Sequence, residues 1–317
     1  MPKIDILMPA PMSPEVISAL DDHFILHRLW KQPDASKFLN KTGPHIRGLA
    51  VSTLAGRIDH ALFDRLPALE IVANFGVGYD NVDARGAASR GIMVTNTPGV
   101  LDDEVADLTL GLLLATIRRI PQAERYLRDG LWPTGSFPLS PTLRGRRVGI
   151  LGLGAIGKAV ARRLDGFGVE IAYHGRARQA DVAYDYYETP VALAKACDVL
   201  IAIVPGGAAT RHLVNADILT ALGSDGVLIN VARGSVVDEM ALFAALRSGT
   251  ILGAGLDVFE NEPNVPAALL DLPNVVVLPH IGSASVKTRA AMGQLVVDNL
   301  LAWFDGGKPV TPVPETT

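Results

Sequence analysis

Residues 147 to 178 contain a strand-like run, a glycine-rich turn, a helical pattern and a second strand-like run, and this order constrains the fold more than any other feature. Glycines at this spacing allow a tight turn, let the backbone approach a pyrophosphate, and pack the next helix closely on the sheet. The free amides at the start of that helix favour an anion. The stretch therefore predicts a dinucleotide-binding unit rather than a merely structural turn. The residues of the predicted turn are Gly152, Gly154, Ala155, Ile156 and Gly157.

The end of the second strand indicates which dinucleotide binds. Proteins for NAD usually have Asp or Glu there, about 20 residues beyond the glycines, whereas Arg accommodates the 2′-phosphate of NADP. This chain has His174, Gly175, Arg176 and Arg178, and no carboxylate among residues 174–178. Two guanidiniums can bind a phosphate dianion through forked hydrogen bonds. The sequence thus favours NADPH over NADH, and the alternative is that both arginines are solvated surface charges.

Composition limits the class of protein. The chain has 317 residues, 49 % apolar and 20 % charged, which is typical of globular proteins and long enough for two domains. Its net charge of −4 gives no general attraction for nucleic acid or a membrane surface. The single cysteine, Cys197, cannot form an internal disulfide, which favours a cytoplasmic protein with an inert buried thiol. We expect no signal peptide, no membrane span and no metal site.

Strand-like apolar runs recur along the chain, separated by helical patterns, which predicts parallel sheets covered by helices on both faces. Because the glycine turn comes only at residue 152, a complete α/β unit is expected to precede the nucleotide domain. The predicted fold class is α/β, with two doubly wound, Rossmann-like sheets. A nucleotide domain at 99–284 is inserted into a flavodoxin-like substrate domain made of 1–98 and 285–317. The runs are 4–8, 48–51, 71–73, 93–95, 148–151, 169–173, 199–204, 227–231, 253–256 and 275–278.

A helix predicted at 102–119 is apolar on nearly all sides, and a last helix is predicted at 286–304. A helix of the first kind is buried, between domains or between subunits. We therefore expect a homodimer. The leucines that surround the helix are Leu108, Leu110, Leu112, Leu113 and Leu114.

Several motifs, taken together and in this order, resemble the D-2-hydroxyacid dehydrogenases, and most of all their glyoxylate/hydroxypyruvate and hydroxyphenylpyruvate reductases. The resemblance covers essentially the whole chain, which makes it far more specific than any single motif. The motifs are GVGYDNVD at 76–83, TNTPGVLDDEVADLTLGLLLA at 95–115, GLGAIG at 152–157, INVARGSVVDE at 229–239, GAGLDVFENEP at 253–263 and LPHIGSAS at 278–285.

The resemblance makes Arg233 the substrate-binding arginine, Glu262 its acidic partner and His280 the acid/base. Physical chemistry supports these roles. A guanidinium can bind the carboxylate of a 2-oxoacid bidentately and polarise the neighbouring ketone. A protonated imidazole can then donate to the ketone oxygen as hydride arrives, and a nearby carboxylate favours that charged form. Taken singly, each residue has a plainer alternative: a loop ion pair, a solvated carboxylate, and a histidine bonded to the following turn.

By resemblance, the N-terminal domain contributes to substrate binding through two loops. The amides of Val77 and Gly78, in a loop where glycine permits a sharp turn, are expected to bind the substrate carboxylate. Leu54 and Ala55, in the loop at 52–56, are expected to contact the substrate side chain. Trp132 resembles an aromatic that relatives place near a substrate pocket, sometimes from a neighbouring subunit, and a plain packing role is equally open.

The resemblance also assigns further cofactor contacts. Asp257 would accept from the nicotinamide carboxamide, and Val204 with Pro205 would line the adenine. Thr109 would contact the nicotinamide end, or else its hydroxyl would bond to its own helix backbone. The loop at 205–210 departs from the Pro-Leu-Thr turn of many relatives, which puts its cofactor contacts in doubt. The remaining assigned residues are Val231, Ala232 and Gly282.

The activity implied is NADPH-dependent reduction of small 2-oxoacids to D-2-hydroxyacids, with glyoxylate and hydroxypyruvate first, phenylpyruvates as further candidates, and His280 as proton donor. One alternative is a phosphoglycerate dehydrogenase-like enzyme. Another, from a different class, is a nucleotide-sensing module like the corepressors related to this fold. A formate dehydrogenase is disfavoured because its relatives carry Gln at the position of Glu262.

Overall fold

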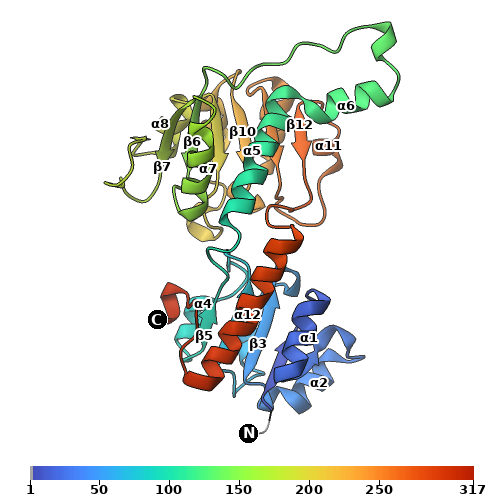
Figure 1. Cartoon of the computed structure of the whole chain (residues 1–317), viewed down its shortest axis with the longest axis vertical. Coiled ribbons are helices and arrows are strands. Elements are labelled where there is room, and N and C mark those ends of the chain that lie inside the picture. Colours follow the sequence, from blue (N-terminus) through green and yellow to red (C-terminus); the bar gives the residue numbers. More distant parts are fainter. Residues whose placement is uncertain (1–2) are drawn as a thin grey trace. The chain divides into compact units, whose positions relative to one another are not determined.

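The structure is a computed structural model that describes residues 3–317 and forms two compact units (Figure 1). Unit 1 comprises the chain up to Leu101 together with Ser285–Thr317, and unit 2 comprises Asp102–Ala284. The sequence predicts the first boundary between residues 98 and 99, within the turn that leads into the long helix. No helix within residues 3–317 is long and apolar enough to cross a membrane.

Unit 1 is built on a five-stranded parallel sheet with the order β2-β1-β3-β4-β5. Its strands are β1 (Asp5–Met8), β2 (Ile25–Arg28), β3 (Gly48–Ser52), β4 (Ile71–Phe75) and β5 (Met93–Thr95). Its helices are α1 (Pro14–His23), α2 (Ala35–Thr42), α3 (His60–Phe63), α4 (Ala84–Ala88) and α12 (Val286–Gly306), with 3-10 turns η1 (Leu29–Lys31), η2 (Gly43–His45), η3 (Thr53–Ala55) and η7 (Pro314–Thr316).

Alternate residues of the strands of unit 1 face two separate cores. Ile6 and Met8 of β1 pack with Leu300 of α12, whereas Leu7 between them packs with Val72 in the core on the opposite face. All five of these side chains are fully buried. A strand buried on both faces is mostly apolar, which is why 6–8 in β1, 49–51 in β3 and 71–73 in β4 read as continuous apolar runs.

Unit 2 is built on a seven-stranded parallel sheet with the order β12-β11-β10-β9-β6-β7-β8. Its strands are β6 (Arg147–Leu151), β7 (Glu170–His174), β8 (Asp185–Tyr186), β9 (Val199–Ala202), β10 (Val227–Asn230), β11 (Gly253–Leu256) and β12 (Val275–Val277). Its helices are α5 (Asp102–Arg118), α6 (Ile120–Arg128), α7 (Ala155–Asp165), α8 (Pro190–Lys195), α9 (Ala216–Leu222), α10 (Glu239–Ser248) and α11 (Ala267–Leu270), with 3-10 turns η4 (Trp132–Thr134), η5 (Ala208–Thr210) and η6 (Gly234–Val236).

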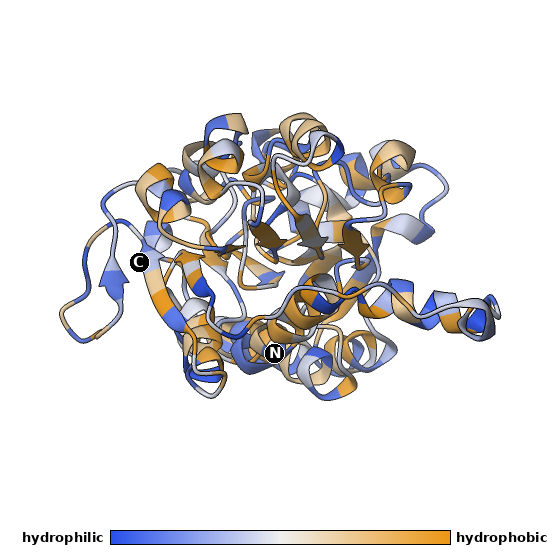
Figure 2. Cartoon of the chain, turned by 90° about the horizontal axis from the view of Figure 1, so that it is seen from above, coloured by the Kyte–Doolittle hydropathy of each residue, from blue (hydrophilic) through white to orange (hydrophobic). Residues whose placement is uncertain are grey.

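The same alternation organises unit 2. In β9, Val199 and Ile201 join the core beneath α5 and α7, and Leu200 joins the core beneath α8, α9 and α10. In Figure 2, apolar (orange) ribbon is seen on the central strands and on stretches of the surrounding helices, and the outer loops are mostly blue or pale. The leucines of α5 pack largely on the sheet of their own unit, since Leu112 and Leu113 are buried there. The apolar surface of this helix therefore does not by itself require a second subunit.

The chain between α5 and β6 extends away from the sheet of unit 2, and we call α6 with the following segment, residues 120–146, the arm (Figure 1). The base of the arm is fixed by Gln122, whose side-chain amide donates to the carbonyls of Pro273 and Val275 at 3.2 Å each. Farther out, the Tyr126 hydroxyl donates to Gly135 O at 2.8 Å and its ring contacts Phe137 edge to face. The arm is thus an ordered element that contacts the rest of unit 2 near both ends, through Gln122 and through Leu143, which is buried in the core.

The predicted fold class, two doubly wound parallel sheets, is confirmed. The apolar runs all correspond to strands, and no strand end differs from the predicted one by more than two residues. Two strands have no counterpart among the predicted runs, β2 and β8, and both lie at sheet edges. An edge strand needs no continuous apolar run because backbone pairing on one side can hold it, and β8 pairs with β7 over only two residues.

Candidate active site

Three predicted catalytic residues follow three adjacent strands of unit 2: Arg233 after β10, Glu262 after β11 and His280 after β12. The carboxyl ends of parallel strands meet at one edge of the sheet, where ligands bind in folds of this kind. The Nδ1 atom of His280 lies 2.7 Å from Oε2 of Glu262. A carboxylate can only accept, so Nδ1 carries the hydrogen, and Nε2 remains as the nitrogen that can transfer a proton.

The surroundings of Glu262 keep it ionised. Burial alone would raise its pKa, but hydrogen bonds from His280 and from the Phe259 amide, together with the charges of His280 and Arg233, outweigh burial and lower the pKa below its usual value. The Phe259 amide donates to Oε1 at 3.0 Å, so both carboxylate oxygens are bonded. Glu262 is therefore an anion at neutral pH, and its carboxylate accepts from the His280 ring.

Arg233 is brought to this pair by close packing of two loops. A Cβ atom at Gly234 would overlap the backbone of Phe259, so the chain after Arg233 and the chain before Glu262 touch without room for a side chain. Asn230 supports the turn, since its side chain donates to Arg233 O at 3.1 Å and accepts from Ala232 N at 3.1 Å. The effect of the Arg233 charge on the pKa of Glu262 shows that the three side chains share one electrostatic environment.

The backbone at His280 is held by Asp257. His280 has a φ of +54°, a left-handed conformation that L residues seldom adopt, and such residues persist only where the surroundings fix them. Asp257, which is 2 % exposed, accepts from the amides of Ile281 and Gly282 at 2.8 Å each. Burial raises its pKa, and these two bonds oppose the shift. Each oxygen keeps a second lone pair that can accept a further hydrogen bond. The bond from Asp257 to a nicotinamide carboxamide stays a prediction.

The loop that carries Glu262 has a second support that the sequence did not reveal. Glu239, at the start of α10, accepts from the Glu260 amide at 2.6 Å. The Glu260 side chain in turn bonds to Arg211 and to His212. Glu239 stands in the ARG-containing motif, but nothing in its spacing shows that it meets a residue 21 positions further along.

The glycine turn has the geometry that a pyrophosphate needs. Gly152 has a φ of +102°, and a Cβ atom at Gly157 would overlap the carbonyl of Gly152, so α7 packs directly on the turn. At Gly154, by contrast, nothing lies within 4 Å of an added Cβ. No side chain caps the N-terminus of α7. The turn therefore offers open backbone and free helix amides to an anion.

The chain after β7 is anchored next to this turn. His174 donates from Nδ1 to Tyr187 O at 2.9 Å, and the Gln179 side chain donates to Leu153 O, within the glycine turn, at 2.8 Å. Between these anchors, Arg176 and Arg178 are exposed, and within residues 3–317 neither guanidinium has a bonded partner. Two free positive charges thus lie in a loop that is tied to the predicted pyrophosphate site. Sequence reasoning missed Gln179, whose role depends on a contact 26 residues away.

The other predicted cofactor residues are distributed as follows. Thr109 is fully buried and its hydroxyl donates to Val105 O at 2.7 Å, which is the second of the two alternatives given for it. Val231 and Ala232 are buried after β10, and Gly282 is buried after β12. After β9, Val204 is half-buried and Pro205 is exposed. In the divergent loop, the Thr210 hydroxyl donates to Pro205 O at 2.6 Å, which closes the turn without a larger side chain.

In unit 1, the predicted substrate loops follow β3 and β4. Val77 and Gly78 are half-buried in the turn after β4. Leu54, in η3 after β3, is 76 % exposed, and the neighbouring Ala55 is half-buried. Trp132 lies in the arm of unit 2 and is 65 % exposed. Cys197 is buried, and burial raises the pKa of its thiol to about 12, as expected for an inert residue.

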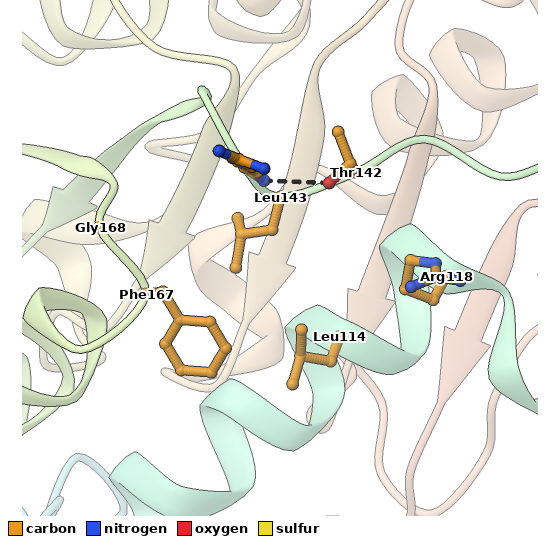
Figure 3. Close-up of a pocket in the computed structure, with 7 residues that line it drawn as sticks. Leu114, Arg118, Thr142, Leu143, Phe167 and Gly168 are labelled. Atoms are coloured by element: carbon orange, nitrogen blue, oxygen red, sulfur yellow. Dashed lines mark hydrogen bonds between the residues drawn. The ribbon is translucent and has the colours of Figure 1, made fainter.

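One surface pocket of unit 2 does not coincide with these residues. It has a volume of about 410 Å³ and lies at the amino edge of the unit 2 sheet, between the end of α5, the end of the arm and the chain before β7 (Figure 3). Its lining includes Leu114, Arg118 and Phe167. The candidate site lies at the opposite, carboxyl edge. Within residues 3–317 no group of histidine, cysteine or acidic side chains could hold a metal ion.

A doubly wound nucleotide unit with an imidazole, a carboxylate and a guanidinium at its carboxyl edge defines a nucleotide-dependent dehydrogenase. The family model described as D-isomer specific 2-hydroxyacid dehydrogenase, NAD binding domain, matches residues 110–282. The chain therefore belongs to the D-2-hydroxyacid dehydrogenase family and is an oxidoreductase.

Individual relatives agree with this assignment. The chain is 47 % identical to a hydroxyphenylpyruvate reductase of Plectranthus scutellarioides and 47 % identical to a glyoxylate/hydroxypyruvate reductase A of Arabidopsis thaliana, covering 99 % of this chain and 100 % of each relative. Among solved structures, the NADPH-dependent glyoxylate/hydroxypyruvate reductase of Sinorhizobium meliloti, in complex with NADP and malonate, is 56 % identical. It superposes with a TM-score of 0.94 over 99 % of this chain and 98 % of that chain.

Proposed function

We propose that this protein is an NADPH-dependent reductase of small 2-oxoacids, glyoxylate and hydroxypyruvate first, and that it forms D-2-hydroxyacids. The observation that carries the proposal is the bond of 2.7 Å between His280 and Glu262, in the same electrostatic environment as Arg233. The names of the relatives above favour this activity over a phosphoglycerate dehydrogenase or a corepressor-like module. Phenylpyruvates are further candidate substrates.

Bound NADPH would supply a hydride to the carbonyl carbon of the substrate. Arg233 binds the substrate carboxylate and polarises the carbonyl group. His280 donates a proton from Nε2 to the carbonyl oxygen, so that the ketone becomes a hydroxyl group as the hydride is added. Glu262 accepts from Nδ1 and thereby holds the imidazole ring in this orientation. From unit 1, the amides of Val77 and Gly78 bind the carboxylate, and Leu54 with Ala55 contacts the substituent on the carbonyl carbon.

The preference for NADPH rests on the chain after β7. Arg176 and Arg178 bind the 2′-phosphate, because both are free and the loop that carries them is tied to the glycine turn through Gln179. His174 and Gly175 begin the same loop. The remaining contacts proposed are those assigned by resemblance, namely Gly152, Gly154, Ala155, Ile156, Gly157, Val204, Pro205, Val231, Ala232, Asp257 and Gly282.

We also propose a cytoplasmic homodimer. The single cysteine is buried, which suits a reducing compartment. The arm exposes large apolar side chains that its own unit leaves uncovered, and a second copy of the chain would cover them. These side chains are Ile120, Leu127, Leu131, Trp132 and Leu139, with exposed fractions of 52, 57, 42, 65 and 100 %.

Steady-state assays test the proposal. We assay the reduction of four 2-oxoacids, glyoxylate, hydroxypyruvate, pyruvate and phenylpyruvate, with NADPH and with NADH. The hydroxyacid 3-phosphoglycerate is assayed for oxidation, with NADP and with NAD. We expect reduction of glyoxylate and hydroxypyruvate with NADPH as the faster coenzyme. The double variant Arg176→Ala, Arg178→Ala should reverse the coenzyme order, since it removes the phosphate contacts and leaves NADH binding intact. Equal rates with both coenzymes in the unaltered protein would contradict the role given to the two arginines.

A further inference from the structure

The turn after β4 in unit 1 has its carbonyl groups bound by side chains and backbone of the same unit. The side-chain amide of Asn74 donates to Gly76 O at 3.3 Å and to Gly78 O at 3.2 Å. Asn96 donates from its side chain to Val77 O at 2.9 Å. The Thr97 amide donates to Gly76 O at 3.0 Å. Every carbonyl from 76 to 78 therefore has a donor supplied by the ends of β4 and β5.

These bonds also determine where the amides point. In a planar trans peptide the N–H is antiparallel to the C=O, so each amide is directed away from the donor that holds the carbonyl before it. Fixing Gly76 O and Val77 O thus fixes the N–H groups of Val77 and Gly78. Within residues 3–317 neither of these amides has an acceptor. Half-buried amides without an acceptor are suited to bind an anion.

Asn74 is a polar residue at a buried position of β4, and its side chain makes the two hydrogen bonds to this turn. It occupies an inward position of β4 and is 1 % exposed, although the other buried positions of the strand are apolar. Its amide nitrogen, rather than its oxygen, must face the two carbonyls, since two oxygens would repel each other. Gly76, with a φ of +153°, allows the chain to turn back toward Asn74, and a Cβ there would lie 3.2 Å from Gly78 O.

Asn96 is itself held by the end of the chain. The Thr311 hydroxyl donates to Asn96 O at 2.6 Å, and the backbone carbonyl of Thr311 accepts from Asn96 N at 3.2 Å. Asn299 of α12, which is fully buried, bonds to Thr311 with both of its side-chain polar atoms at 2.9 Å. The turn at 76–78 is therefore supported from two directions, by β4 and by the segment after α12.

We propose that Asn74 and Asn96 are positioning residues for the substrate: they hold the carbonyls of the 76–78 turn so that the amides of Val77 and Gly78 are presented to the carboxylate of the 2-oxoacid. This inference rests on the proposed function. It adds two side chains that do not touch the substrate but determine how tightly its carboxylate binds.

The test compares Asn74→Leu with a matched control, Asn274→Leu. The Asn274 side chain likewise donates to two carbonyls, Leu246 O at 3.3 Å and Leu252 O at 3.2 Å, but at the amino edge of the unit 2 sheet. Loss of two such bonds should lower thermal stability in both variants. Only Asn74→Leu should raise KM for glyoxylate and Kd for oxalate, by about tenfold or more, with KM for NADPH unchanged. Oxalate binding is measured by calorimetry on the complex with NADP.

Asn96→Ala, at a half-buried position, provides a milder variant should Asn74→Leu fail to fold, and we expect the same direction with a smaller change. An oxalate Kd that stays at the wild-type value in the folded variants would overturn the inference, as would a wild-type protein that does not bind oxalate. Failure of the proposed function has a different signature: the wild type would bind oxalate and yet not reduce glyoxylate or hydroxypyruvate.

Discussion

Among the properties of single residues, the negative charge of Glu262 is the one on which the proposed chemistry depends most. Its carboxylate is half-buried, which by itself would favour the protonated form, but bonds to the His280 ring and the Phe259 amide more than compensate. At neutral pH the imidazole therefore has an anion at Nδ1, and Nε2 is left as the nitrogen that can transfer a proton. Replacing the anion by a neutral group of the same shape separates charge from geometry.

We predict that Glu262→Gln lowers kcat for glyoxylate reduction at neutral pH by about tenfold or more, because a neutral amide is a weaker acceptor for the His280 ring than a carboxylate. The loss stays below the roughly 100-fold or more of general acid catalysis as a whole, since His280 itself remains. The measurement is kcat and KM of both proteins at neutral pH. Glu260→Gln, two residues away in the same loop and bonded to Arg211 instead, should lower kcat much less. A kcat for Glu262→Gln equal to that of the wild type would exclude the proposed role.

The same substitution has a consequence for stability. The pKa of Glu262 is lowered by folding from an ordinary value of 4.5, so the folded state binds this proton less readily than the unfolded state. The interactions of the carboxylate then stabilise the fold fully above pH 4.5 and are lost as pH falls through the lower, folded-state value. We expect the difference in unfolding free energy between wild type and Glu262→Gln, measured with urea, to be largest near neutral pH and to shrink in acid. A constant difference would contradict this linkage.

At the scale of an element, the glycines of the turn between β6 and α7 have different structural roles. Gly157 gives the helix its close contact with the turn, since a Cβ there would overlap Gly152 O. Gly154 has free space around it and an extended backbone with a φ of −80°, so the fold itself does not require glycine there. The requirement at Gly154 comes from the approach of a ligand.

We predict that Gly157→Ala destabilises the protein, by about 1–3 kcal/mol as for other overpacked sites, because α7 must move off the turn. Gly154→Ala should leave the unfolding midpoint unchanged and weaken NADPH binding, since a methyl group would meet the pyrophosphate. Thermal unfolding and fluorescence titration with NADPH distinguish the two effects. If Gly154→Ala bound NADPH as tightly as wild type, the pyrophosphate could not lie against this turn.

How far the sequence could predict these elements depends on what holds each of them. Strands buried on both faces, such as β9, read directly as apolar runs, and the motif around His280 placed the imidazole beside a carboxylate. The edge strand β2 could not be predicted from an apolar run because its pairing with β1 holds it. The role of Asn74 could not be predicted either. A buried polar side chain is explained only by its hydrogen-bond partners, and those of Asn74 lie in a turn whose shape the sequence does not specify.

At the scale of the whole molecule, the arm exposes large apolar side chains that contacts within one chain do not account for. Within the arm, Tyr126 and Phe137 fix its conformation, yet Leu139 is wholly exposed and Trp132 is 65 % exposed. Large apolar side chains gathered on an ordered, projecting element indicate a protein interface. Because most soluble oligomers are symmetric assemblies of one chain, we expect two copies to cover each other's arms.

We predict that Leu139→Asp, alone or with Trp132→Ser, shifts the protein from dimer to monomer, because a charge would be buried without a partner at the interface. Light scattering coupled to size exclusion at micromolar concentration measures the mass. Met240→Asp is the matched control: Met240 is 77 % exposed on α10, outside the arm, and its substitution should not change the mass. A wild-type protein that elutes as a monomer would contradict the homodimer. A Leu139→Asp protein that remains dimeric would place the interface elsewhere than the arm.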